Sequence, residues 1–214
     1  MEPNIYKPNI YKTPTVYKSA GGGGGGLPDD VILFNSLENL NAVSGNGLTI
    51  EFNQTNENIE FIFDYEIKSF SGSNIWLINK NPVSAYAPFI QLNNAYDTTY
   101  LSNASNNSNT MYSAAHTLNY RYTRSMKNGV YKNYFGGNLK TGIPYGVFTI
   151  PKLDFISFVQ GLIKIYCIAI KKDDDFIYKL KPAKKLNDVG MFDEINNVFY
   201  TMDSGNWSVL GQII

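Results

Sequence analysis

Cysteine, histidine and charge are scarce in this sequence of 214 residues. The single cysteine, Cys167, excludes an internal disulfide. Because His116 is the single histidine, a Ser-His-Asp triad is not expected, and neither is a histidine-rich metal site. Charged residues make up 17% of the chain, and 18 Lys and Arg balance 18 Asp and Glu. No global field attracts nucleic acid or an anionic membrane, so neither is expected as a partner.

Long apolar segments are missing as well. The longest apolar runs are far shorter than the roughly 20 residues that span a bilayer. No apolar segment with a cleavage site follows Met1, where Glu2 and recurring prolines stand instead. We therefore expect a protein that is made in the cytoplasm and has no membrane span.

Tyrosine (16) and phenylalanine (13) are abundant, and they stand among many Asn, Ser, Thr and Gly residues. This mixture favours half-buried strands and the turns between them, which indicates a single all-β domain. Residues 31–43 leave room for a helical turn, and the polar segment 103–108 is expected to be an exposed loop or hairpin end. We predict strands at 48–52, 59–67, 75–78, 89–92, 118–124, 130–135, 161–171, 177–181 and 198–202.

The N-terminal segment repeats one short pattern three times. Asn4-Ile5-Tyr6-Lys7, Asn9-Ile10-Tyr11-Lys12 and Thr15-Val16-Tyr17-Lys18 each follow a proline. Proline interrupts a hydrogen-bonded ladder, so each unit can form only a short extended piece, which cannot build a core of its own. The pattern predicts an anchor whose units add strands to a partner's sheet edge. The alternative is a disordered leader, which the aromatic and β-branched content disfavours.

Residues 21–26 are six consecutive glycines, a flexible linker that spans roughly 13 Å. No strand precedes this run and no Lys-Ser/Thr follows it, so it is not a phosphate loop. We predict an extended repeated anchor peptide over 1–19, a glycine linker over 20–27 and a β-sandwich domain over 28–214. The linker uncouples the orientations of anchor and domain, and we hypothesise that it absorbs a symmetry mismatch.

The last third of the chain carries the most specific pattern. A long alternating strand at 161–170 precedes a second strand that we expect to end before Pro182. A glycine-entered hairpin over 189–201 then turns at Asn196-Asn197. This order of elements resembles the C-terminal half of LamG-like, concanavalin A-type sandwiches that are widespread in phage and prophage virion proteins. The resemblance implies a jelly-roll sandwich, which residues 49–135 fit with looser motifs.

The sequence of this hairpin predicts the backbone conformation of one residue and the side-chain directions of two others. Glycine at position 190 permits a backbone conformation closed to other residues, and we expect the hairpin to use this freedom. Phe199 and Tyr200 are neighbours in a predicted strand, so their rings are expected on opposite faces.

The repeat and glycine run, with the bias to Asn, Ile, Tyr and Lys, also resemble head-fibre or decoration proteins of crAss-like phages of Bacteroidales. Members of that class bind the capsid exterior through a repeated N-terminal peptide and project a β domain. The resemblance implies a structural virion protein on the capsid exterior, docked to capsid or other virion proteins through residues 1–19. It also implies a homo-oligomer, a trimer rather than a dimer. The matching anchor residues are Ile5, Tyr6, Lys7, Ile10, Tyr11, Lys12, Val16, Tyr17 and Lys18.

Glu60, Asp64 and Glu66 stand at even separations, so we expect them on one strand face. Some members of the wider concanavalin A-like class are glycosidases, which use two carboxylates. The spacing here departs from their Glu-x-Asp-x-(x)-Glu pattern, and polar residues alternating with Phe and Ile are typical of any solvated strand face. We therefore predict no catalytic residues and no enzymatic activity.

Metal, cofactor and thiol chemistry find little support. Asp173, Asp174 and Asp175 follow two lysines, but consecutive carboxylates diverge, so a solvated turn is favoured over a calcium loop. Cys167 lies in an apolar run without a basic neighbour to lower its pKa, and it is expected to be a small buried hydrophobe. His116 is expected at the surface or in a turn. We predict no metal site and no cofactor.

Two functions remain compatible. The first is a virion decoration or head-fibre protein anchored by residues 1–19. The second is a glycan-binding, lectin-like adhesion module of a phage tail or fibre, in which exposed Trp76, Trp207 or tyrosines stack on sugar rings. Its partner is a host-surface or mucosal glycan.

Overall fold

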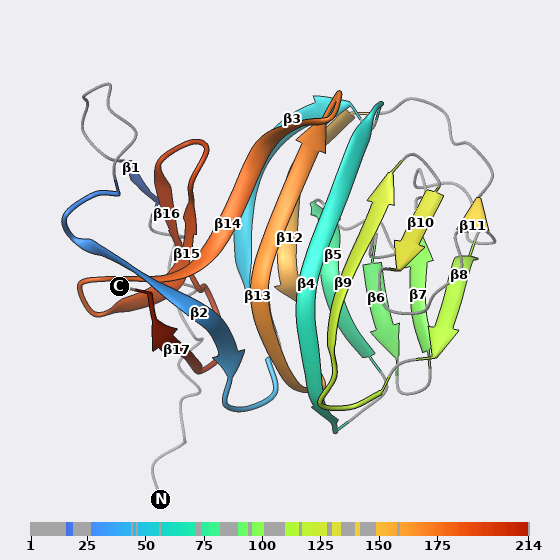
Figure 1. Ribbon diagram of the computed structural model, residues 1–214, viewed down its shortest axis with the longest axis horizontal. Helices are drawn as coiled ribbons and strands as arrows, with labels where there is room; N and C mark the ends of the chain where they lie inside the picture. The colour runs from blue at the N-terminus through green and yellow to red at the C-terminus, as the bar shows by residue number, and fades with distance from the viewer. Residues whose placement is uncertain are drawn as a thin grey trace, which may run out of the picture.

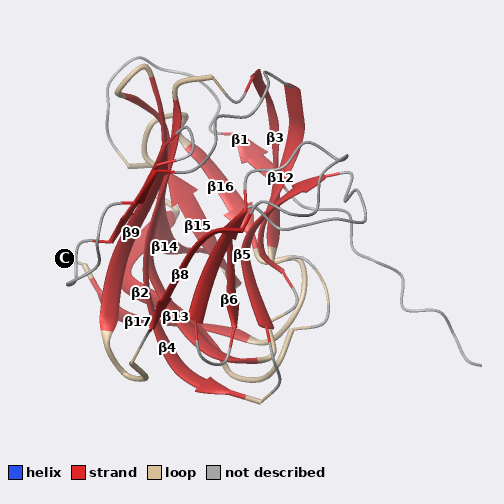
Figure 2. Cartoon of the chain, turned by 90° about the vertical axis from the view of Figure 1, so that its right-hand side faces the viewer, coloured by secondary structure: helices blue, strands red, loops and turns tan. Residues whose placement is uncertain are grey.

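The computed structural model describes the chain over residues 16–18, 27–43, 45, 47–55, 57–71, 74–81, 90–93, 96–100, 110–115, 117–127, 130–133, 140–141, 149–157 and 159–213. Over these residues the regular elements are all strands, and they form two antiparallel sheets that lie face to face (Figures 1 and 2). The prediction of an all-β sandwich is confirmed by this two-sheet architecture. The described part of the chain contains no helix long and apolar enough to cross a membrane.

The larger sheet has 11 strands. Its spatial order is β1 (Val16–Lys18), β16 (Val198–Thr201), β15 (Asp188–Asp193), β14 (Asp175–Lys185), β2 (Val31–Asn39), β13 (Gly161–Lys172), β4 (Ile59–Phe70), β9 (Arg121–Lys127), β10 (Val130–Asn133) and β11 (Lys140–Thr141). Beside this path, β17 (Trp207–Gln212) pairs with β2.

The smaller sheet has six strands and lies behind β4, β9 and β13 in Figure 1. Its order is β3 (Leu48–Thr55), β12 (Thr149–Ser157), β5 (Asn74–Asn81), β6 (Ile90–Asn93), β7 (Tyr96–Tyr100) and β8 (Thr110–Ala115). Each predicted strand has a counterpart here or in the larger sheet. The strand predicted from Leu118 begins at Arg121, because Leu118 and Asn119 form a turn. The segment 103–108 lies outside the described residues.

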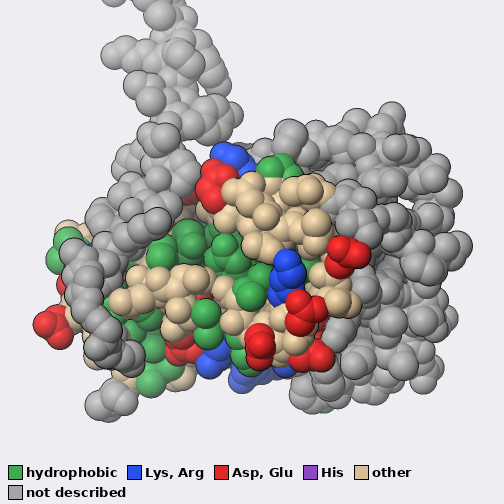
Figure 3. All heavy atoms as spheres, turned by 90° about the horizontal axis from the view of Figure 1, so that it is seen from above, with side chains coloured by type: hydrophobic (Ala, Val, Ile, Leu, Met, Phe, Trp, Pro, Cys, Tyr) green, Lys and Arg blue, Asp and Glu red, His purple; other side chains and the backbone are tan. Residues whose placement is uncertain are grey.

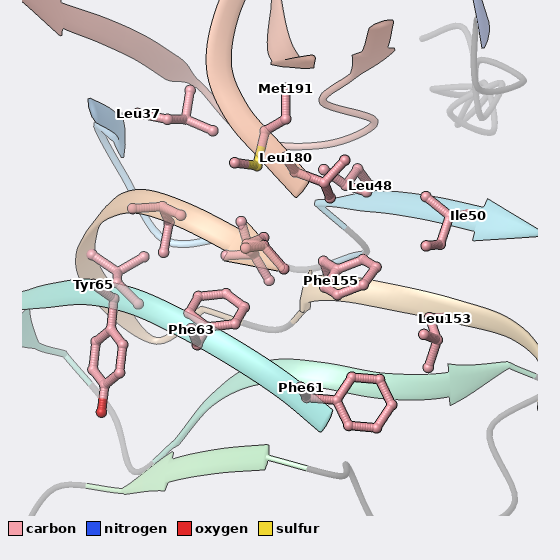
Figure 4. Close-up of a cluster of buried hydrophobic side chains, with 14 of the residues drawn as sticks. Leu37, Leu48, Ile50, Phe61, Phe63, Tyr65, Leu153, Phe155, Leu180 and Met191 are labelled. Carbon is pink, nitrogen blue, oxygen red and sulfur yellow. The ribbon is translucent and has the colours of Figure 1, made fainter. Parts of the chain in front are cut away.

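Strict alternation along β4 builds the core. Its odd-numbered residues from Ile59 to Ile67 are buried between the sheets, because successive strand side chains point to opposite faces. Figure 4 shows Phe61, Phe63 and Tyr65 projecting from this strand toward side chains of the facing sheet, which include Phe155 of β12. The even-numbered residues from Glu60 to Lys68 point away from the core and form part of the outer face of the larger sheet.

β2 fills a fork between β13 and β14. β13 and β14 pair near their shared turn and then diverge. Residues Val31–Leu33 pair with β14, and Leu37 and Glu38 pair with β13. The helical turn allowed for 31–43 is therefore wrong. Neighbours on both sides satisfy the backbone of this apolar segment in an extended form, so tertiary pairing decides its conformation.

β14 continues past the point where we expected it to end. Pro182 lies within the strand, opposite Met191 of β15. It stands where β14 changes partners, after the last pair with β13 at Leu180 and before the first pair with β2 at Ala183. A missing N–H donor is tolerated at such an irregular position, so proline does not stop this strand.

The expectation for Gly190 is wrong in its reason, although glycine is required there. Gly190 does not have a positive φ, so its backbone conformation is not one that is closed to other residues. A Cβ atom at this position would lie 2.0 Å from the carbonyl oxygen of Tyr200 on the neighbouring strand. Close approach of β15 and β16 therefore selects glycine. The turn after β15 is at 194–197, as expected, with Asn197 at φ 56°.

A second, smaller cluster lies on the outer side of β14, β15 and β16. Phe192 and Phe199 stand opposite each other in the β15–β16 ladder and are buried together with Val31 and Ala183. Tyr200, next to Phe199 in sequence, packs against the main core instead. The prediction that Phe199 and Tyr200 point to opposite faces is confirmed.

β14 of the larger sheet and β3 of the smaller sheet meet through side chains. The Tyr178 hydroxyl of β14 donates to the Glu51 carbonyl oxygen at 3.1 Å, and the Tyr178 ring centre is 6.0 Å from that of Phe52. Seen from above, Figure 3 shows hydrophobic side chains at the surface with acidic and basic side chains near them. Aromatic side chains, rather than a continuous strand ladder, connect the two sheets here.

Candidate functional site

A connected group of polar side chains lies on the outer face of the larger sheet. We call it the outer-face cluster, and it consists of Asp64, Glu66, Lys68, Arg121 and Tyr166. The first three are alternate residues of β4, so they share a face. The β4–β9 register places Arg121 opposite Glu66, and β13 supplies Tyr166 from the other side. Three adjacent strands therefore build the cluster.

Arg121 is held in a fixed orientation. Its Nε donates to Asp64 Oδ1 at 2.9 Å and its Nη2 donates to Asp64 Oδ2 at 2.6 Å, a bidentate pair. The guanidinium carbon also lies 3.9 Å from the centre of the Tyr166 ring. The Arg121 side chain is still 54% exposed, so it remains available to a ligand.

Glu66 is the acceptor at the centre of the cluster. Its Oε2 accepts a hydrogen bond from the Tyr166 hydroxyl at 2.7 Å, and its Oε1 accepts one from Lys68 Nζ at 2.5 Å. Burial opposes ionisation of Glu66, but the bonds from Lys68 and Tyr166 and the charges of Lys68 and Lys164 outweigh it and lower the pKa. Burial, with the bond to Glu66, raises the pKa of Tyr166.

These shifts define what the cluster can do. At neutral pH Glu66 is an anion and Tyr166 is a protonated donor, each already satisfied by a partner in the cluster. The outer-face cluster is therefore a rigid array of donors, acceptors and an aromatic ring. Such an array suits recognition of a polar ligand with several hydroxyl or carboxylate groups.

The structure brings the three predicted carboxylates onto one face, as expected. Asp64 and Glu66 belong to the outer-face cluster, and Glu60 stands between Lys127 of β9 and Lys171 of β13 in the pairing register. Arg121 and Tyr166 were not predicted, because their roles depend on a register between strands that are far apart in sequence. The only sequence signal was their outward position in alternating strands.

Other residues named from the sequence are placed as follows. Cys167 is half-buried, and burial raises the pKa of its thiol. Trp207 is half-buried against the core, and its Nε1 donates to the Ser204 carbonyl at 2.6 Å, so the expected exposed platform at Trp207 is wrong. Trp76 lies in β5, where only the backbone is described, and His116 lies outside the described residues.

The three consecutive aspartates form the end of the β13–β14 hairpin. Asp173 and Asp174 occupy the turn with φ of 52° and 70°, and Asp175 opens β14 opposite Lys172. All three are exposed. Within the described ranges, no group of three or more His, Cys, Asp or Glu residues is arranged to hold a metal ion.

The described part of the predicted anchor is β1. Val16, Tyr17 and Lys18 pair antiparallel with Tyr200, Phe199 and Val198 of β16. This pairing crosses the predicted boundary between anchor and sandwich. The remaining predicted anchor residues, Ile5, Tyr6, Lys7, Ile10, Tyr11 and Lys12, lie outside the described residues, as do residues 20–26 of the linker.

One ionisable site was missed by sequence reasoning. The Asp203 N–H donates to the Gly47 carbonyl at 2.6 Å, which holds the segment after β16 against the start of β3. Burial, with the charge of Asp154, raises the pKa of Asp203 to about 6. Asp203 follows a strand in a polar stretch, so nothing in the local sequence signals its burial.

Comparison with known proteins adds little. No protein-family model matches this chain, and no curated protein sequence matches it significantly. Among solved structures, an alginate lyase, AlgAT5 from polysaccharide lyase family 7, is similar at 13% identity and a TM-score of 0.38. The match covers 56% of this chain and 62% of that one, so the chain spans less than two thirds of its length. A likeness at this level carries no argument about activity, and the fold rests on the strand pairings above.

Proposed function

We propose that this chain is a non-enzymatic structural protein of a bacterial virus, a head fibre that decorates the capsid exterior. The N-terminal repeats dock on capsid or other virion proteins, and the β-sandwich is displayed outward. The protein acts as a homo-oligomer, a trimer rather than a dimer. It needs neither a cofactor nor a metal for this role.

One observation carries the proposal. The third repeat unit forms a strand, β1, on the edge of a sheet, in one-to-one register with β16. A Pro-x-(Ile or Val)-Tyr-Lys unit is therefore compatible with edge addition, the mode in which backbone hydrogen bonds provide affinity and side chains provide specificity. The units at 4–7 and 9–12 have the same order of residues and suit the same mode of docking on a partner.

Deletion of residues 1–19 tests the proposal. We expect the truncated chain to be lost from purified capsids, measured as copies per capsid after co-expression with the head proteins. Unchanged incorporation would remove the anchor. Single Tyr6→Ala, Tyr11→Ala and Tyr17→Ala variants should give graded losses, because several weak contacts act together. The matched Tyr→Phe variants retain the ring and serve as controls.

The outer-face cluster favours a second candidate function, glycan binding. It combines a half-buried aromatic ring with fixed charged groups on a broad strand face. Sugars with acidic groups suit the exposed Arg121 guanidinium. A displayed sandwich of this kind can hold a virus near glycan-rich surfaces, so both functions are compatible.

A glycan array with the full chain tests this second function. We expect Arg121→Ala and Tyr166→Ala to abolish any signal that the unmodified chain gives. Lys152→Ala is the matched control, because Lys152 forms an exposed ion pair with Glu51 in the smaller sheet. Absence of binding to every glycan at millimolar concentration, or equal loss in the Lys152 variant, would rule out this function for the cluster.

A further inference from the structure

The larger sheet ends in a strand that comes from the repeat segment. β15 occupies one side of β16 and β1 occupies the other, at the end of the strand order. Val198 and Phe199 of β16 are buried, so this is an apolar strand. An apolar strand with an open edge is a template for pairing with another chain. β1 therefore covers an edge that needs an occupant.

The chain has three repeat units for this edge. The residues that pair with β16 are Val16-Tyr17-Lys18, and the corresponding triplets are Ile5-Tyr6-Lys7 and Ile10-Tyr11-Lys12. Isoleucine and valine are both β-branched and equally suited to a strand, and the other two residues are identical. Whatever favours the third unit on β16 therefore acts on the first two as well. Only one unit can occupy a given edge at a time.

The segment that connects the repeats to the sandwich does not determine which repeat unit pairs with β16. Residues 19–30 join β1 to β2 and include six consecutive glycines, a composition that predicts a flexible tether for the third unit. Compared with a unit from another copy, the third unit gains only from its tether, which gives it an effective concentration at β16 of the order of millimolar. When copies are crowded, exchange of units between copies preserves every strand pair, which is the condition for low-cost domain swapping.

We infer that the β16 edge is a receptor for repeat units of a second copy of this chain, so that neighbouring copies are joined by exchanged strands. A unit from one copy takes the place of β1 on the next. The inference rests on the part of the proposed function that treats the repeats as docking units, and it identifies one partner as the chain itself. It does not depend on the identity of any other virion protein.

Disulfide trapping between two full-length chains tests this inference. In the β1 register Val16 lies opposite Tyr200, so Ile10 of a docked second unit would lie there as well. One chain carries Ile10→Cys, and the other carries Tyr200→Cys with Tyr17→Pro to vacate the edge. Both carry Cys167→Ser to remove the native thiol. Facing cross-strand positions are close enough for a disulfide.

We expect the mixed chains to form a heterodimeric disulfide at roughly ten times the yield of a Glu2→Cys control, because docking raises the local thiol concentration. Equal yields would overturn the inference. A second pair, Lys12→Cys with Val198→Cys, follows from the Lys18–Val198 pairing and serves if the Tyr200 variant does not fold by circular dichroism. Non-facing pairs should stay at the control level.

The trapping result separates this inference from the proposed function. Control-level trapping together with normal capsid incorporation would remove strand exchange and leave the docking proposal. Strong trapping without any incorporation would support strand exchange and remove the capsid role. Incorporation is measured on the same full-length variants.

Discussion

Burial changes the chemistry of single ionisable residues in this protein. Asp203 is half-buried where the segment after β16 meets the start of β3. Burial, assisted by the charge of Asp154, raises its pKa from an ordinary 3.8 to about 6. The folded state therefore binds a proton more tightly than the unfolded state does, and ionisation of Asp203 destabilises the fold at neutral pH.

The predicted consequence is a pH-dependent stability that Asp203→Asn removes. The free energy of unfolding should fall as pH rises from about 4 to about 6.5, with a contribution of about 1–2 kcal/mol once solvent screening of a half-buried group is allowed for. Asp203→Asn keeps the shape without the charge, so it should be more stable than the unmodified chain at pH 7 and equal to it near pH 4. Urea unfolding at both pH values measures this. Parallel pH profiles for the two proteins would contradict the assignment.

For single residues, the sequence predicts well which face of a strand a side chain lies on, and poorly which residues it bonds to. The even spacing of Glu60, Asp64 and Glu66 was enough to place them on one face. The bidentate partner of Asp64 was not predictable, because Arg121 is 57 positions away and reaches it only through the β4–β9 register. Trp207 shows the same limit, since only the folded chain brings it against the core.

The hairpin of β15 and β16 shows how one element constrains a residue. Gly190 lies against Tyr200, and a Cβ atom there would be 2.0 Å from a backbone oxygen. Gly190→Ala must push the two strands apart, and we expect it to lower the free energy of unfolding by about 3 kcal/mol or more. Thermal or denaturant unfolding measures the loss.

Gly45→Ala is the matched control. Among the described residues its new Cβ would meet the side chain of Ser204, with Oγ at 3.2 Å, and no backbone atom. We expect a change within about 0.5 kcal/mol. If both variants lose stability equally, close approach of β15 and β16 is not what selects glycine.

Strands were predictable where apolar and polar residues alternate and where the strand keeps one neighbour along its whole length. β4 and β13 begin at the predicted residues and continue three residues and one residue past the predicted ends, because each has one face in the core. The sequence of β2 also allows a helical turn, because nothing in it shows that the segment pairs with two diverging strands. The predicted end of the strand before Pro182 is wrong for a related reason. Whether a proline ends a strand depends on whether the neighbouring strand needs an N–H donor at that position.

At the scale of the whole molecule, two features set the function that we propose. The sandwich places the outer-face cluster on a broad sheet surface, and β1 joins the repeat segment to the last strand of that same sheet. The all-β class was predictable from composition and turn spacing. The use of a repeat unit as a strand of the sandwich itself was not, because its partner, β16, lies about 180 positions further along the sequence.

The placement of β2 also has a consequence for how the chain is made. In the described structure β2 pairs with β13, β14 and β17, all within residues 161–212, although it is synthesised long before them. Such distant contacts slow folding and expose unpaired segments in the meantime. A nascent chain that ends before residue 161 leaves Val31–Asn39 without any of these partners. The first long strand to leave the ribosome therefore completes its ladder last, after translation has reached the C-terminal strands.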